Sequence, residues 1–114
     1  MTEATIHSFT KKRLQIMETQ GKCTFYHVPN GLPRSGKYAA MLKNMGARNG
    51  VADFCLVLKG GRAAFLELKS ETGTQSPDQE KFQENCERLG ALYRVASTPD
   101  EVNDILTEWE REAA

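Results

Sequence analysis

The chain has 114 residues, with 15 Lys and Arg against 15 Asp and Glu, and 39% of its residues are hydrophobic. This length fits one compact domain with a modest core, so we expect residues 1–114 to form a single domain. No apolar run approaches membrane-spanning length and the N-terminus lacks the apolar stretch of a signal peptide, which predicts a cytosolic or nuclear protein without a membrane partner. Three separated cysteines, no CxxC pair and two histidines argue against a zinc site.

The charges are distributed unevenly along the chain. Residues 1–48 contain eight basic and two acidic side chains, a net charge of +6, whereas residues 75–114 contain four basic and ten acidic side chains, a net charge of −6. A basic half is typical of a protein with an anionic partner, of which nucleic acid is the common one. The same charges equally fit solvated helix faces, so this feature alone leaves both interpretations open.

The first half of the chain predicts a helix, a strand and a second helix. Apolar residues recur at helical spacing over residues 4–20, and Gly21 follows as a terminator. Residues 23–28 form a short β-prone run that ends in a Pro-Asn-Gly turn. Residues 37–45 again show helical spacing, and Gly46 ends that helix.

The second half predicts a hairpin followed by a helix, a strand and a last helix. Residues 53–58 and 63–68 read as strands around a Lys-Gly-Gly turn. Ser76-Pro77-Asp78-Gln79 has the form of a capping box that opens a helix, which Gly90 closes. A strand over 92–96 and a helix after Thr98 complete the order α-β-α-β-β-α-β-α. Because the two hairpin strands are apolar on both faces, we expect an α/β fold with a sheet flanked by helices.

Two polar residues stand out in the second hairpin strand. Glu67 and Lys69 alternate with leucines, so both lie on one face of a strand that is expected to be buried. Asp53 begins the preceding strand. A two-residue Gly60-Gly61 turn would place Asp53 opposite Leu68, whereas a three-residue turn that includes Lys59 places Asp53 opposite Glu67. We therefore predict a three-residue turn, or a bulge of equal effect.

Two carboxylates and a lysine held in this way suit a hard divalent cation and a phosphodiester. Mg²⁺ prefers oxygen ligands and is often bound by one or two carboxylates together with substrate phosphates. Lys69 then stabilises developing negative charge or positions the attacking water. The alternative is a Glu-Lys pair on an exposed edge strand. The spacing D-x13-E-x-K is a weak signal alone, and its placement on two apolar strands strengthens it.

The segment GVADFCLVLKGGRAAFLELKSETGTQSPDQEKF resembles the core of the VRR-NUC domain, the virus-type replication-repair nuclease of the PD-(D/E)XK superfamily. The upstream HVPNG and KYAAMLKNMGARNG resemble its small stand-alone phage and bacterial members. One departure is Ala52, where the family usually has proline. The likeness extends over almost the whole chain. The matching elements are Gly50, Asp53, Glu67-x-Lys69, Ser76-x-x-Gln79 and Gly90.

The resemblance implies a restriction-endonuclease-like fold with a mixed β-sheet and metal-dependent cleavage of DNA. It implies Asp53 and Glu67 as ligands of Mg²⁺ or Mn²⁺, the Leu68 backbone carbonyl as a third oxygen and Lys69 as the catalytic lysine. Gln79 matches a glutamine on the helix beside the site, although the capping box explains it equally well. A glutamate of the first helix often completes such sites, and Glu3 is the acidic candidate here.

Contacts with DNA are predicted around the basic half of the chain. The histidine and asparagine lie at the end of the first strand, and the lysines and arginines surround the second helix. These residues also have structural explanations: the asparagine fits an ordinary Asn-Gly turn, the histidine could pack on its strand, and the lysines could simply solvate a helix. The resemblance favours contacts with DNA phosphates instead. The candidates are His27, Asn30, Arg34, Lys37, Lys43 and Arg48.

The resemblance as a whole implies an endodeoxyribonuclease of DNA repair in a phage or bacterial host cell, with no small-molecule cofactor. We expect selectivity for branched DNA such as Holliday junctions, with a homodimer that matches the two-fold junction. The acidic C-terminal half with Trp109 would form the dimer surface or pack internally. The alternatives are a monomeric nickase or flap nuclease, and a non-catalytic DNA-binding module on the same fold.

Overall fold

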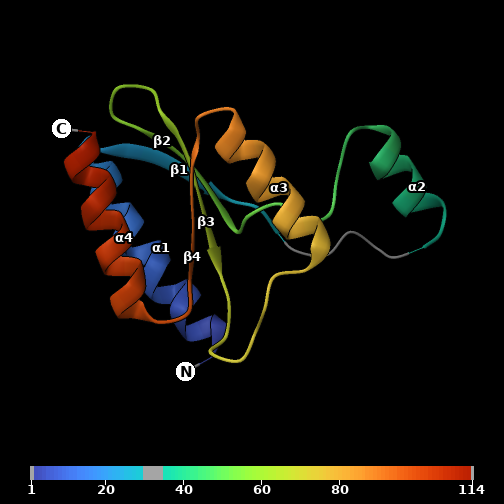
Figure 1. Cartoon of the computed structure of the whole chain (residues 1–114), viewed down its shortest axis with the longest axis horizontal. Coiled ribbons are helices and arrows are strands. Elements are labelled where there is room, and N and C mark those ends of the chain that lie inside the picture. Colours follow the sequence, from blue (N-terminus) through green and yellow to red (C-terminus); the bar gives the residue numbers. More distant parts are fainter. Residues whose placement is uncertain (1, 30–34, 114) are drawn as a thin grey trace.

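A computed structural model describes residues 2–29 and 35–113 of the chain. Within these two ranges, four helices and four strands follow one another in the predicted order (Figure 1). Side-chain caps begin three of the helices: Thr2 accepts from the Thr5 N–H, Ser76 from Gln79 and Thr98 from Glu101. The elements are α1 (Glu3–Thr19), β1 (Cys23–His27), α2 (Lys37–Asn44), β2 (Phe54–Leu58), β3 (Ala63–Leu68), α3 (Pro77–Arg88), β4 (Leu92–Ala96) and α4 (Pro99–Glu112).

The four strands form one mixed sheet in the order β1-β2-β3-β4. β1 and β2 pair antiparallel, as do β2 and β3, whereas β3 and β4 run parallel and are connected by α3. A parallel pair needs such a crossover, since a tight turn cannot return the chain to the starting edge. The predicted α/β class with a mixed sheet flanked by helices is confirmed.

The turn between β2 and β3 contains three residues, as the strand alternation required. The Leu58 N–H donates to the Arg62 carbonyl at 2.9 Å, which leaves Lys59, Gly60 and Gly61 as the turn. Both glycines have positive φ, at +96° and +93°, where a side chain is strained. Pairing of Phe54 with Leu66 follows from this turn, so the next position, Asp53, falls opposite Glu67.

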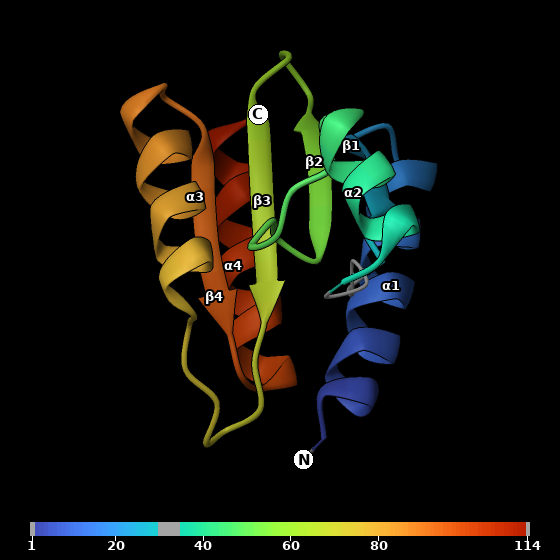
Figure 2. The ribbon, with the colours of Figure 1, turned by 90° about the vertical axis from the view of Figure 1, so that its right-hand side faces the viewer.

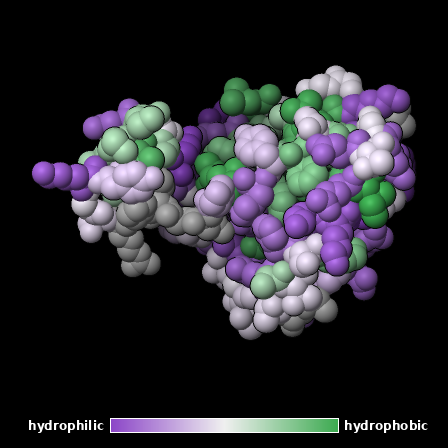
Figure 3. All heavy atoms as spheres, turned by 180° about the vertical axis from the view of Figure 1, so that it is seen from behind, coloured by the Kyte–Doolittle hydropathy of each residue, from purple (hydrophilic) through white to green (hydrophobic). Residues whose placement is uncertain are grey.

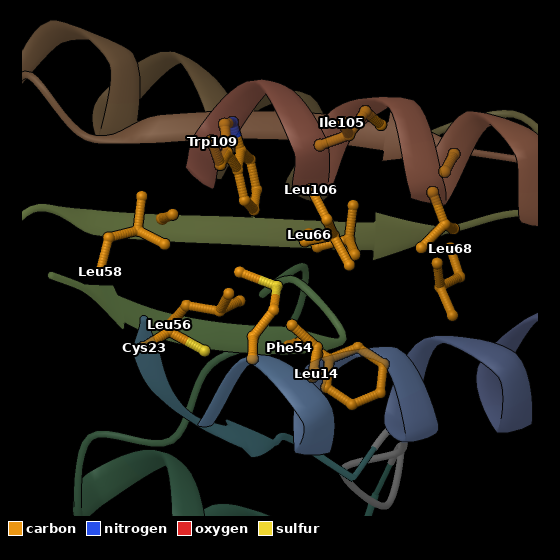
Figure 4. Packing of buried hydrophobic residues seen from close by; sticks show 14 of the residues in the cluster. Leu14, Cys23, Phe54, Leu56, Leu58, Leu66, Leu68, Ile105, Leu106 and Trp109 are labelled. Atoms are coloured by element: carbon orange, nitrogen blue, oxygen red, sulfur yellow. The ribbon is translucent and has the colours of Figure 1, made fainter. Parts of the chain in front are cut away.

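One face of the sheet packs against α1 and α4 and forms the main core. Phe54, Leu56 and Leu66 from the central strands meet Leu14 from α1 and Trp109 from α4 (Figure 4). All five side chains are almost fully buried. Burial of such side chains contributes roughly 1.5–3 kcal/mol each. Trp109 therefore packs internally, and a dimer surface on the outer face of the acidic α4 stays a prediction.

Among the described residues, the opposite face of the sheet is covered over β3 and β4 alone. There α3 lies next to β4 (Figure 2). Its Phe82 packs edge-on against Phe65 at 5.4 Å between ring centroids and also contacts Tyr93. On the β1 and β2 half of this face, Tyr26 and Val57 are exposed. The prediction of a sheet flanked by helices on both faces therefore holds for β3 and β4, while the β1–β2 half of this face stays open.

Helix α2 stands apart from the rest of the fold. It projects beyond α3 in Figure 1 and forms a separate lobe in the space-filling view of Figure 3. Ala39 is its only buried residue. Within the described ranges, no helix is long and apolar enough to cross a membrane.

Candidate active site

Asp53 and Glu67 meet where β2 begins and β3 ends. The Leu68 N–H donates to Asp53 Oδ2 at 2.6 Å, which ties the carboxylate to the end of β3. The Asp53 carbonyl accepts hydrogen bonds from the Val28 N–H and from His27 Nδ1, each at 2.8 Å. Because side chain and backbone are both held, the Asp53 carboxylate has a fixed position beside β3.

Glu67 is fully buried, and its two carboxylate oxygens have different surroundings. Oε1 accepts hydrogen bonds from the Tyr93 hydroxyl at 2.5 Å and from Gln75 Nε2 at 3.3 Å. Oε2 has no hydrogen-bond partner in the part of the chain that the structure describes, and it lies 3.7 Å from the Lys69 ammonium nitrogen. Burial, and next the hydrogen bond to Glu67, raise the pKa of Tyr93, so the hydroxyl keeps its proton and stays a donor.

The oxygens at this point of the sheet fit a hard divalent cation. A buried carboxylate oxygen without a hydrogen-bond partner costs free energy unless a positively charged group compensates for it. The Lys69 ammonium, at 3.7 Å, compensates only in part. Asp53 and Glu67 supply carboxylates, and Leu68 lies beside Asp53 with a backbone carbonyl. Among residues 2–29 and 35–113, no three His, Cys, Asp or Glu side chains are gathered closely enough to hold a metal alone. This set suits Mg²⁺, which keeps several waters.

A cleft of about 230 Å³ opens next to Asp53. Glu3 and His7 line it from α1, His27 from β1, and Asp53 and Leu68 from the hairpin. The Glu3 carboxylate accepts a hydrogen bond from the Ser70 N–H at 3.2 Å. The structure therefore brings Glu3 to the mouth of the cleft, where it binds the backbone just after β3, and its role as a metal ligand stays a prediction.

The two histidines of the chain lie together in this cleft. Their rings meet edge-on with centroids 4.5 Å apart, and His7 also packs against Phe54. A carbonyl oxygen can only accept, so His27 Nδ1 carries the hydrogen that it donates to Asp53. Burial, and next the neighbouring His27, lower the pKa of His7. His7 is therefore neutral at pH 7, beside a carboxylate.

Gln79 occupies the capping box instead of contacting the carboxylates. Its Oε1 accepts from the Ser76 N–H at 2.9 Å while its own N–H donates to Ser76 Oγ at 3.2 Å. The glutamine that reaches Glu67 is Gln75, whose amide nitrogen also donates to Gln83 Oε1 at 2.8 Å. The capping-box alternative is thus confirmed for Gln79, and its assignment as a catalytic residue has no contact that supports it.

The predicted DNA-contacting residues are spread over three places. His27 lies in the cleft, and Lys37 and Lys43 lie on the outlying helix α2. The Arg48 guanidinium sits 5.3 Å above the Phe82 ring on α3, in a cation–π contact. Asn30 and Arg34 lie outside the described residues. Of the four candidates that the structure describes, His27 is therefore the one that lies close to Asp53.

Three residues at the site were not found from the sequence. Tyr93 contacts Glu67 because parallel pairing places it on the neighbouring strand, where Glu67 pairs with Val95 and Phe65 with Tyr93. Gln75, in the loop before α3, donates to Glu67, and Gln83 on α3 accepts a hydrogen bond from the same Gln75 amide. The available signal was a tyrosine in a short buried strand, since a buried hydroxyl usually needs a partner.

Comparison with known proteins gives the same fold. No family model matches the sequence, and no curated protein matches it. Two solved structures are similar. One, described as "VRR_NUC domain", has a TM-score of 0.66 and 19% identity over 92% of this chain and 94% of its own. The other, described as "VRR_NUC domain protein", has a TM-score of 0.68 and 18% identity over 97% and 89%. The chain therefore has the fold of VRR_NUC domains, which confirms the resemblance at the level of the fold.

Proposed function

We propose that this chain is a metal-dependent nuclease of the PD-(D/E)XK type that hydrolyses phosphodiester bonds in DNA. The observation that carries the proposal is the fully buried Glu67 carboxylate. One of its oxygens is held by Tyr93 and Gln75, and the other, next to Lys69, has no hydrogen bond from any described residue. A buried charge arranged in this way costs stability, and such an arrangement is typical of catalytic sites. The similarity to VRR_NUC structures supports the same reaction class.

The residues of this site would have three separate roles. Asp53, Glu67 and the Leu68 carbonyl would hold Mg²⁺ or Mn²⁺, which when bound neutralises charge on the phosphate and lowers the pKa of a bound water. The Lys69 ammonium stabilises negative charge that develops on the phosphate oxygens. Tyr93 and Gln75 fix Oε1 of Glu67 and so aim Oε2 at the reaction centre.

The finer proposal is an endonuclease selective for branched DNA such as Holliday junctions, acting as a homodimer that cuts two strands. Phosphate contacts by His27, Lys37, Lys43 and Arg48 belong to it, as does Glu3 as a further ligand. The two-fold symmetry of a four-way junction matches a two-fold dimer. Because phosphate contacts release counterions, the affinity for DNA should fall as salt rises.

A cleavage panel tests this proposal. Labelled duplex, nicked, flap, Y-form and four-way DNA are incubated with wild type in Mg²⁺ or Mn²⁺, and the same panel is run with Asp53→Asn and with the control Asp104→Asn on α4. We expect cuts with wild type and the control, and none with Asp53→Asn. Junction binding without cleavage in either metal would favour the non-catalytic module, and single cuts by a monomer would favour the nickase or flap nuclease.

A further inference from the structure

An aromatic ring is exposed on the half of the sheet that the described residues leave open. Tyr26 on β1 is 61% exposed, and Val57 on β2, on the same face, is 48% exposed. A single exposed apolar side chain is ordinary in a soluble protein. Tyr26 differs because of where the strand places it, which is next to the carboxylates of the candidate active site.

The strand register places Tyr26 beside Asp53. Tyr26 pairs with Cys55, and the Val28 N–H donates to the Asp53 carbonyl at 2.8 Å, so the pairing of the two strands continues to that point. Because residues two apart on a strand share a face, Tyr26, Cys55 and Asp53 project to the same side of the sheet. Diagonal neighbours of this kind are about 7–8 Å apart, within reach of an aromatic side chain. The ring therefore borders the place where a phosphate would bind.

The ring of Tyr26 is neutral, and its backbone is held in the sheet. A hydrogen bond with the Cys55 side chain raises the pKa of Tyr26, so the hydroxyl keeps its proton at neutral pH. An uncharged ring does not repel a phosphate. β1 pairs with β2 along its whole length, from Cys23 to His27, which fixes the backbone that carries the ring. Tyrosine has few rotatable bonds, so it supplies contact area at a low cost in conformational entropy.

Positive charge borders the open half of the sheet. The Arg48 guanidinium lies over Phe82, which packs against Phe65. Phe65 in turn pairs with the β2 residue that pairs with Tyr26. Residues 35–52 contain two lysines besides Arg48 and no acidic residue. Both lysines are on α2, which lies in front of β1 and β2 in Figure 2. Basic side chains around an exposed aromatic ring are typical of surfaces that bind unpaired nucleic acid strands.

We propose that Tyr26 stacks on an unpaired base of the DNA substrate while the neighbouring phosphate lies at Asp53, so that the protein selects DNA with unpaired nucleotides next to the cut. In a continuous duplex, neighbouring base pairs cover both faces of each base, so a protein ring can stack only where a base is unpaired or flipped out. Flaps, forks and open branch points supply such bases. This contact deepens the proposed function, on which it rests for the phosphate site at Asp53, by naming the feature of branched DNA that the protein recognises.

DNA binding tests this contact without cleavage. Every protein carries Asp53→Asn, so that the DNA stays intact in Mg²⁺, and fluorescence anisotropy compares Tyr26→Ala, Tyr26→Phe and the control Val57→Ala on flap and on duplex DNA. Loss of a base–aromatic stack should weaken flap binding by Tyr26→Ala about 5- to 100-fold, whereas duplex binding should change less than about twofold. Tyr26→Phe keeps the ring and should bind flap DNA almost as tightly as the parent chain, as should Val57→Ala.

A second readout reports directly on stacking. The base analogue 2-aminopurine, placed at the first unpaired nucleotide of the flap, loses fluorescence when a ring stacks on it. Its emission should therefore fall when the parent chain or Tyr26→Phe binds, and it should stay high with Tyr26→Ala.

Three results would overturn the proposal, provided that circular dichroism shows every variant folded. Flap binding and quenching that survive Tyr26→Ala would show that the ring does not contact a base. Equal losses on flap and duplex DNA would remove the selection of unpaired bases. Equal weakening by Val57→Ala would assign the open face to a general apolar contact, such as one with a protein.

Cleavage is assayed separately on chains in which Asp53 is intact. A protein that quenches the analogue but never cuts DNA would refute the nuclease proposal alone. A protein that cuts without quenching would refute the stacking contact alone.

Discussion

The two faces of β3 differ in the kind of side chain that they bury. Toward α1 and α4, the strand places Ala64, Leu66 and Leu68 in a continuous apolar core. Toward α3, the same strand places Phe65 and then Glu67, a fully buried carboxylate, with Lys69 just beyond. Burial of apolar area explains the first face completely.

The second face needs another explanation. A buried charge costs several kcal/mol unless it is paired and hydrogen-bonded, and Glu67 is satisfied at only one oxygen. The first face therefore stabilises the fold, whereas the second gives up stability at the carboxylate that the proposed function assigns to the metal. Each face therefore predicts a different response to substitution.

The largest effect is expected from Glu67→Gln. This change keeps the size of the side chain and removes its charge, so metal-dependent cleavage should fall ~10³-fold or more. The free energy of unfolding in urea should stay within about 1 kcal/mol of wild type or rise, because a buried charge is removed. Glu84→Gln on exposed α3 is the control for both measurements. A large loss of stability with cleavage retained would reverse the roles of the two faces.

Trp109→Ala tests the apolar face. Removal of this buried ring from α4 should lower the free energy of unfolding by about 3–5 kcal/mol, through lost burial and the cavity left behind. Cleavage per folded molecule, assayed below the unfolding midpoint, should change little. If the substitution abolished cleavage while the fold stayed stable, the division between the faces would be wrong.

Tyr93→Phe separates the support of Glu67 from Glu67 itself. Loss of the hydroxyl removes one donor to Oε1 and frees the carboxylate to rotate. We expect roughly 10- to 100-fold weaker Mn²⁺ binding, measured by calorimetry, at nearly unchanged stability. Tyr26→Phe, on the open β1–β2 half of the sheet, is the control. Unchanged Mn²⁺ affinity in Tyr93→Phe would show that the hydrogen bond does not position Glu67.

The smallest effect on stability is expected from substitution of Glu110 on α4, the helix that packs on the apolar face of β3. Burial raises the pKa of Glu110, but hydrogen bonds from Lys22 and Arg13 outweigh it and lower the pKa overall. A folded-state pKa below the unfolded value gives stability that is present above the unfolded pKa and lost as pH falls through the folded one. Glu110→Gln should therefore flatten the loss of stability below about pH 4, by up to about 1 kcal/mol.

Urea unfolding over a pH series checks this prediction. Glu108→Gln, in the exposed pair with Arg94, is the matched control. If the free energy of unfolding fell equally with decreasing pH in Glu110→Gln and in wild type, the ion pairs of Glu110 would not be the source of this pH dependence.

Much of the fold and half of the site followed from the sequence. Alternation fixed Glu67 and Lys69 on one face, and the length of the Lys59–Gly61 turn then determined that Asp53 lies opposite Glu67. Tyr93 could not be predicted, since parallel pairing of β3 with β4 joins residues far apart in the chain and leaves no local pattern.

Other parts of the structure depend on tertiary contacts that periodicity does not encode. The pattern of α2 predicts a helix with an apolar face, but it does not say what covers that face. Gln79 and Gln75 stand four residues apart, and only the path of the loop before α3 decides that Gln75 contacts Glu67.

Cleavage of a labelled four-way junction in Mg²⁺ by wild type, Lys69→Ala and Lys59→Ala tests the central claim most directly. Both substitutions remove a lysine from the same hairpin, one beside Glu67 and one in the exposed turn. We expect Lys69→Ala to lose cleavage by about 10²-fold or more and Lys59→Ala to match wild type. Equal cleavage by all three proteins would contradict a site built from Asp53, Glu67 and Lys69.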